Sequence, residues 1–164
     1  MSDDLPPQDL ALLQQFAQGL NNYINARAGI YREASDLSAI VNYSFSQNRD
    51  VAFDLAPMLT PEQLKGVLPQ LFGFATYFNA YMQTATDLVF KLPIDWLREN
   101  IAKYAEPILQ SQYIEAEEFD RIIYIYNLID REMAFGVIKR ALEHDDEDIN
   151  KMGAIWQEKL NATE

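Results

Sequence analysis

A run of 21 residues without a charged side chain, Gly66–Thr86, constrains this fold more than any other feature of the sequence. It lies inside the segment 60–92, where apolar residues recur at spacings of three and four and so share one helical face. Thr60 supplies an N-cap hydroxyl, Pro61 suits the first helical position, and Gln63 can close a capping box. The segment therefore predicts one long, mostly buried central helix.

The segments before this central helix also predict helical structure. Apolar residues at helical spacing indicate a first helix from about residue 8 to residue 34. Ser35 or Asp36 can cap a second helix, which ends in the polar residues 46–50. Residues 51–55 alternate as in a strand, but the run is short, so we expect a helical turn or a loop there.

The segments after the central helix predict further helices. One begins near Ile94, and Pro107 is expected to kink or split it. Residues 121–129 are rich in β-branched and aromatic side chains, which favours a strand. The acids that precede them and the lack of a second strand candidate favour a helix instead. Residues 130–160 show one pattern twice, an acidic cap followed by apolar residues at helical spacing, and this predicts a C-terminal helical hairpin.

Residues 130–160, DREMAFGVIKRALEHDDEDINKMGAIWQEKL, resemble one repeat of the HEAT or armadillo-like helical solenoids. In those repeats an acid-led start precedes each short amphipathic helix. The resemblance covers about a fifth of the chain, and Asn150 and Lys151 stand where the family often has an arginine. It implies helix stacking and a role in binding, and it carries over no functional residue.

Taken together, these patterns predict an all-α protein. We expect a single compact domain of about six or seven stacked helices over residues 8–164, preceded by a flexible tail of residues 1–7. A chain of 164 residues with 49% hydrophobic side chains can bury a sizeable core without a metal or a disulfide, and this chain has no cysteine.

Charge and polarity narrow the choice of partners. The net charge of −12 and the pI near 4.4 argue against binding to nucleic acid or to anionic membranes. Polar residues interrupt the uncharged run, which argues against a transmembrane helix. The first residues are acidic where a signal peptide is basic, so we expect a cytoplasmic location.

No catalytic or cofactor motif stands out. The chain has no cysteine and a single histidine, and no serine lies in the sequence pattern of a catalytic nucleophile. Its six glycines are scattered, so it contains neither a phosphate-binding loop nor a dinucleotide-binding motif. We therefore expect no catalytic residue, no cofactor and no metal, although carboxylate pairs from distant positions stay open. The acidic turn 143–148 matches the start of a calcium loop, but Lys151 occupies the position of the required glycine, so we expect a solvated helix cap.

Aromatic side chains give the remaining functional hypothesis. The candidate ligand or partner face consists of Phe74, Tyr77, Phe78, Tyr81 and Tyr124. The first hypothesis is a non-catalytic adaptor or assembly module that binds another protein or a second copy of itself. The alternative is a helical domain that binds an apolar or aromatic small molecule beside the central helix. A third interpretation places these residues only in the core.

Overall fold

The computed structural model describes residues 6–162, and within them it contains ten α-helices, one short 3₁₀ helix and no strand. The predicted all-α class is therefore confirmed. The predicted tail falls mainly on residues 1–5, which lie outside the described part of the chain. The helices are α1 (Pro7–Glu33), α2 (Leu37–Gln47), α3 (Arg49–Leu55), η1 (Ala56–Met58), α4 (Pro61–Thr76), α5 (Met82–Val89), α6 (Ile94–Asn100), α7 (Ala102–Leu109), α8 (Ala116–Ile129), α9 (Arg131–Leu142) and α10 (Glu147–Asn161).

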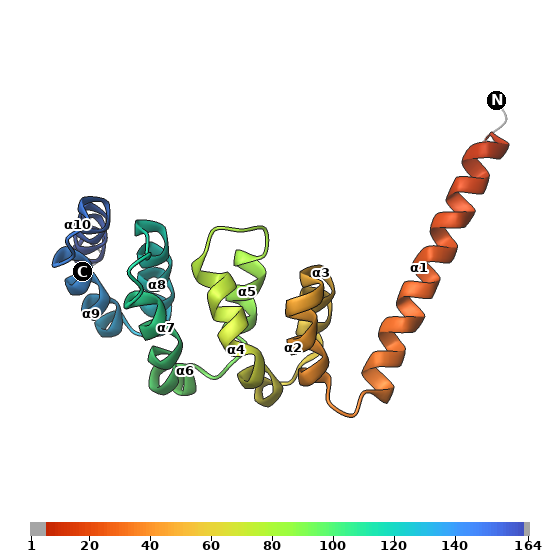
Figure 1. Cartoon of the computed structure of the whole chain (residues 1–164), viewed down its shortest axis with the longest axis horizontal. Helices are drawn as coiled ribbons and strands as arrows, with labels where there is room; N and C mark the ends of the chain where they lie inside the picture. Colours follow the sequence, from red (N-terminus) through yellow and green to blue (C-terminus); the bar gives the residue numbers. More distant parts are fainter. Residues whose placement is uncertain (1–5, 163–164) are drawn as a thin grey trace.

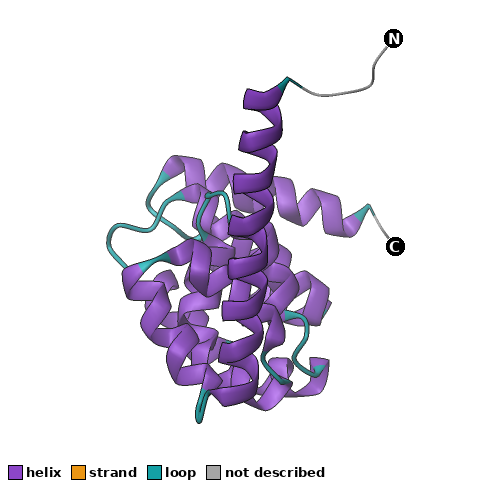
Figure 2. Ribbon diagram, turned by 90° about the vertical axis from the view of Figure 1, so that its right-hand side faces the viewer, coloured by secondary structure: helices purple, strands orange, loops and turns teal. Residues whose placement is uncertain are grey.

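The helices form pairs that stack side by side along the molecule (Figure 1). α2 pairs with α3, α4 with α5, α6 and α7 with α8, and α9 with α10. Neighbouring pairs are joined by contacts of α2 with α4, of α4 with α8, and of α8 with both α9 and α10. We call α2 to α10 the stack. α1 leaves the stack at an angle, and its amino-terminal half projects beyond the other helices in both views (Figures 1 and 2).

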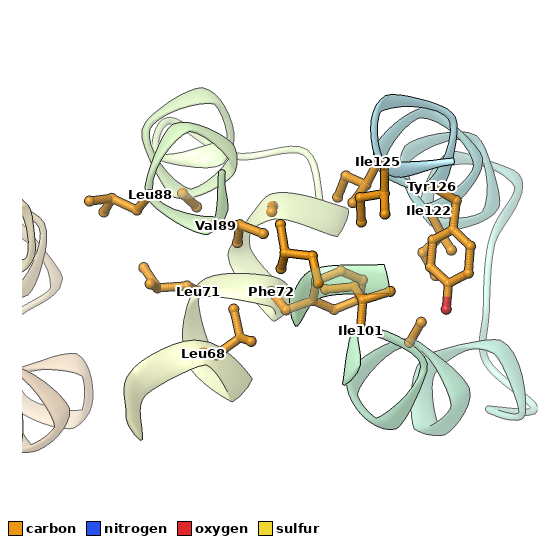
Figure 3. Packing of buried hydrophobic residues seen from close by; sticks show 14 of the residues in the cluster. Leu68, Leu71, Phe72, Leu88, Val89, Ile101, Ile122, Ile125 and Tyr126 are labelled. Atoms are coloured by element: carbon orange, nitrogen blue, oxygen red, sulfur yellow. The ribbon is translucent and has the colours of Figure 1, made fainter. Parts of the chain in front are cut away.

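One hydrophobic core runs through the stack, because side chains from each pair reach the next. Phe72 of α4 is completely buried and lies toward Ile101, at the junction of α6 and α7, and Ile122 of α8 (Figure 3). Leu71 and Val89 bury the contact between α4 and α5 on the other side. The apolar spacing that predicted a buried central helix is thus explained by contacts with the helices on both sides.

The single helix predicted over residues 60–92 is wrong, because α4 and α5 are separate helices that pack against each other. The break is held by Asn79, whose side-chain amide donates to the carbonyl of Phe74 over 2.9 Å. Its oxygen accepts the backbone N–H of Tyr81 over 2.8 Å. One asparagine thereby replaces backbone hydrogen bonds that a continuous helix would have made.

The predicted helix boundaries agree with the structure at several caps. Thr60 caps α4 in a complete capping box with Gln63, and Asp36 caps α2 by accepting the N–H of Ala39. Pro69 is accommodated inside α4. Residues 121–129 belong to α8, so the preference for a helix over a strand is confirmed.

Three other predictions need adjustment. Residues 51–55 lie in a proper helix, α3, because Asn48 caps it by accepting the N–H groups of Asp50 and Val51. The division between α6 and α7 falls at Ile101, while Pro107 lies inside α7. These divisions, with the break at Asn79, give ten helices in residues 6–162 where six or seven were expected. The C-terminal hairpin is present as α9 and α10.

Candidate functional site

Half of the exposed large apolar side chains in residues 6–162 lie on one helix, α1. Every other α-helix in residues 6–162 contains at least one buried residue, whereas none of the 27 residues of α1 is buried. Large apolar side chains that stay exposed along α1 define what we call the α1 face: Leu10, Leu12, Leu13, Phe16, Leu20, Tyr23, Ile24 and Tyr31.

The α1 face is one side of an amphipathic helix. At about 100° per residue these apolar side chains fall on the same half of the helix, and amide side chains occupy the other half. The opposite half carries Gln14, Gln18, Asn21, Asn22 and Asn25. No charged residue occurs between Leu10 and Ala26. Such a helix normally places its apolar side against a neighbour, and exposed apolar patches of this kind mark interaction sites.

The carboxyl-terminal half of α1 is tied to α3 through Asp54. The Nε of Arg27 lies 3.1 Å from an oxygen of Asp54, and the Tyr23 hydroxyl donates to the same carboxylate. The hydrogen bond to Asp54 raises the pKa of Tyr23 above its ordinary value. Ile30 packs against the edge of the core. α1 is therefore anchored at one end and unsupported at the other.

A mainly apolar cleft of about 380 Å³ opens between α1 and α3. Its walls are formed by Tyr23, Ala26, Arg27 and Ile30 from α1 and by Asp50, Val51, Asp54 and Leu55 from α3. The cleft lies where α1 diverges from the stack, and it can accept apolar side chains from another molecule.

A cluster of aromatic rings joins α2, α3, α4 and the start of α5. Phe53 stacks on Tyr81 with ring centroids 4.4 Å apart, and Phe74 meets the edges of both rings. Phe45 completes the cluster. The Tyr81 hydroxyl donates to Asp50, and this hydrogen bond raises the pKa of Tyr81. The cluster is a packing unit with a polar tip at the surface.

The structure divides the five predicted site residues among three environments. Phe74 and Tyr81 are half-buried in the aromatic cluster. Tyr77 and Phe78 lie on the loop between α4 and α5 and are 56% and 71% exposed. Tyr124 lies on α8, where the Arg121 guanidinium sits 4.7 Å from its ring centroid. The predicted residues therefore do not form one continuous helix face.

A second open cleft, also of about 380 Å³, adjoins two of these predicted residues. It is lined by Arg49, Pro69, Gln70, Gly73, Phe74, Tyr77 and Asn79. The Arg49 guanidinium lies 5.3 Å from the Phe74 ring centroid. A cation beside an exposed aromatic surface suits a flat or anionic small molecule.

The acidic turn 143–148 serves as the cap of α10. An oxygen of Asp146 accepts the N–H groups of Asp148 and Ile149 at 2.9 and 3.2 Å, so this part of the prediction is confirmed. Within residues 6–162, no group of three or more histidine, cysteine, aspartate or glutamate side chains is arranged to hold a metal ion.

Sequence reasoning missed the α1 face. Most of its residues follow the helical spacing that predicts the first helix, but this spacing is the same whether the apolar stripe meets a core or remains open. No helix within residues 6–162 is both long enough and apolar enough to span a membrane. Comparison of the chain with protein-family models, curated proteins and solved structures gives no match.

Proposed function

We propose that this protein is a non-catalytic helical interaction module that binds another polypeptide through the α1 face. The observation that carries the proposal is the exposure of eight large apolar side chains on a 27-residue helix that has no buried residue. Leaving such a stripe in water is unfavourable by about 25 cal/mol per Å² of apolar surface, and a partner that covers it removes this cost.

The stacked helical pairs support the same proposal. They are the arrangement expected of HEAT-like or armadillo-like modules, which we propose as the organisation of this chain, and stacked pairs present extended faces to partners. The net charge of −12 favours a protein partner over nucleic acid. A cytoplasmic location is part of the proposal.

Native mass spectrometry of the protein, isolated gently from its own source cells, tests the proposal. We expect a stoichiometric second polypeptide, which is lost when Phe16→Asp places a charge in the α1 face. The matched control is Gln18→Asp, which adds the same charge on the opposite side of the same helix and should retain the polypeptide. A chain that is always recovered alone, in wild type and both variants, would overturn the proposal.

A small-molecule-binding domain is the second candidate, and the cleft lined by Phe74 and Tyr77 favours it. In that case the same spectra would show a small added mass on a single chain. Tyr77→Ala should release it, because Tyr77 lines the cleft and is mostly exposed, so its truncation leaves the core intact. Phe78→Ala serves as control, since Phe78 is exposed on the same loop but does not line the cleft.

A further inference from the structure

We infer that the polypeptide covering the α1 face is α1 of a second copy of this chain, paired antiparallel with the first. This inference rests on the proposed function and names the partner of the same surface. It would make the protein a two-fold symmetric dimer in which each copy offers the same patch to the other.

Charge is the first argument for a second copy. α1 contains two acidic and two basic residues, which cancel, so the whole net charge of −12 belongs to the rest of the chain. Asp9 is the one charged residue in the amino-terminal half of α1, and the stretch from Leu10 to Ala26 is uncharged. It offers no electrostatic attraction to a strongly basic or acidic partner, whereas a neutral apolar helix matches it, and a second α1 is such a helix.

Charge also selects the antiparallel arrangement. In a parallel pair the two stacks would lie at the same end and repel each other, because residues 37–161 of each copy carry 19 acidic and 11 basic side chains. In an antiparallel pair of projecting helices the stacks lie at opposite ends. Each helix dipole is positive at the amino end and negative at the carboxyl end. Only the antiparallel arrangement places the positive end of one helix beside the negative end of the other, which is an attractive interaction.

The available surface matches what a reversible dimer needs. α1 is about 40 Å long at 1.5 Å per residue, and roughly its amino-terminal half projects beyond the stack (Figure 1). Pairing along this part can cover large apolar side chains that are now 45–70% exposed, in a small interface of the kind that weak, transient complexes use: Leu10, Leu12, Leu13, Phe16 and Leu20. Phe16 belongs to the amino-terminal half of α1 and, at 70%, is the most exposed of the large apolar side chains on this helix, so we expect it to be the main anchor.

The anchorage of α1 keeps the face available to a second copy. Arg27 and Tyr23 both bond to Asp54, which fixes the carboxyl-terminal half against α3. The projecting half continues in the same helix and has no neighbour of its own within residues 6–162. A helix that is already formed loses less conformational entropy on pairing than a disordered segment does, which favours association.

The decisive measurement is the mass of the purified protein in solution, by analytical ultracentrifugation from about 1 to about 100 μM, the range where such an interface is expected to dissociate. We expect twice the chain mass of 18.9 kDa at the upper end. Phe16→Asp should remain monomeric throughout with unchanged helical circular dichroism, and Gln18→Asp should dimerise like the wild type.

Orientation is tested with a single cysteine, because the natural chain has none. In an antiparallel pair the two copies of residue 10 lie more than roughly 10 Å apart along the helices, too far for a disulfide. Leu10→Cys should therefore dimerise without an intermolecular disulfide under oxidising conditions. A disulfide between the two copies would overturn the antiparallel arrangement.

The failure of this inference is separable from the failure of the proposed function. A wild-type protein that stays monomeric up to about 100 μM overturns self-pairing. If native spectra from source cells then show a different polypeptide that Phe16→Asp releases and Gln18→Asp retains, the interaction module stands with another partner. If those spectra also show the chain alone, without a second polypeptide, both the self-pairing and the proposed function are wrong.

Discussion

At the scale of single residues, Gly153 allows α10 to pack closely against α9. A Cβ at this glycine would lie 2.9 Å from the Cβ of Ala141 and 3.1 Å from the backbone N of Leu142. Neither neighbour is a flexible side-chain end. Gly153→Ala should therefore lower the free energy of unfolding by about 1–3 kcal/mol, although alanine is the better helix former.

The control for this prediction is Gly136→Ala on α9. Gly136 is exposed, and a Cβ there would meet nothing within 4 Å. This variant should gain about 0.5–1 kcal/mol from helix propensity alone. Urea unfolding of both variants measures the difference. Equal shifts in the two midpoints would show that α10 does not cross α9 as closely as described.

Tyr126 gives a prediction on pH. Its hydroxyl is buried without a hydrogen-bond partner in the described chain, and burial raises its pKa from 10.0 to about 12. The folded state thus holds this proton after the unfolded state has lost it. The resulting stability is present below pH 10 and is lost as the pH rises toward 12.

Tyr126→Phe should therefore unfold with no loss of stability at pH 7, because removing an unsatisfied buried hydroxyl is close to neutral. Between pH 10 and pH 12 its free energy of unfolding should fall less steeply than that of the wild type. Chemical unfolding at a series of pH values measures both curves. Parallel curves over that range would contradict the burial of this hydroxyl.

At the scale of elements, the sequence predicted that the segments are helical, but it located only some of the helix ends. Caps made by Thr60, Asp36 and Asp146 use local patterns, so the sequence alone located them. The break at Asn79 could not be located in the same way. Asn79 acts by reaching the Phe74 carbonyl five residues back, and the apolar spacing around it continues as if the helix were unbroken. The apolar spacing indicates which residues face inward. It continues through both α4 and α5, so it does not distinguish one long helix from two helices packed against each other.

Asn79→Ala tests the role of this break. The variant loses the bond to the Phe74 carbonyl and the acceptor for the Tyr81 N–H, so we expect a loss of about 1–2 kcal/mol in the free energy of unfolding. Asn42→Ala, an exposed position within α2, makes the same substitution and should be neutral or slightly stabilising. The melting temperatures of the two variants measure the difference. Equal melting temperatures would show that Asn79 does not stabilise the break between α4 and α5.

The residues of the predicted binding face also depend on contacts between segments that are far apart in the sequence. Tyr77 and Phe78 were predicted as a binding face within a helix, and their exposure on a loop depends on the break at Asn79. Tyr124 is covered by Arg121, which also donates to the Ala75 carbonyl and the Thr86 hydroxyl and so joins α8 to α4 and α5. No local pattern indicates such a contact, because its partners are 46 and 35 residues away along the chain.

At the scale of the whole molecule, the stack and α1 are nearly independent. Each pair of the stack shares buried side chains with the next pair, whereas α1 adds no buried residue and is held mainly by Asp54 and Ile30. Arg27 and Asp54 are both more than a third exposed, so their ion pair adds little stability in water. Most of the folding energy therefore resides in residues 37–161.

A chain that begins at Ser35 should accordingly fold by itself. Its free energy of unfolding is expected to lie within about 1 kcal/mol of the full-length chain, because only exposed contacts are removed. The correct reference is full-length Phe16→Asp, in which pairing between copies does not add to the measured stability. A loss of several kcal/mol on truncation would mean that α1 packs along the stack in solution and covers its own apolar face, and self-pairing through that face would then lose its structural basis.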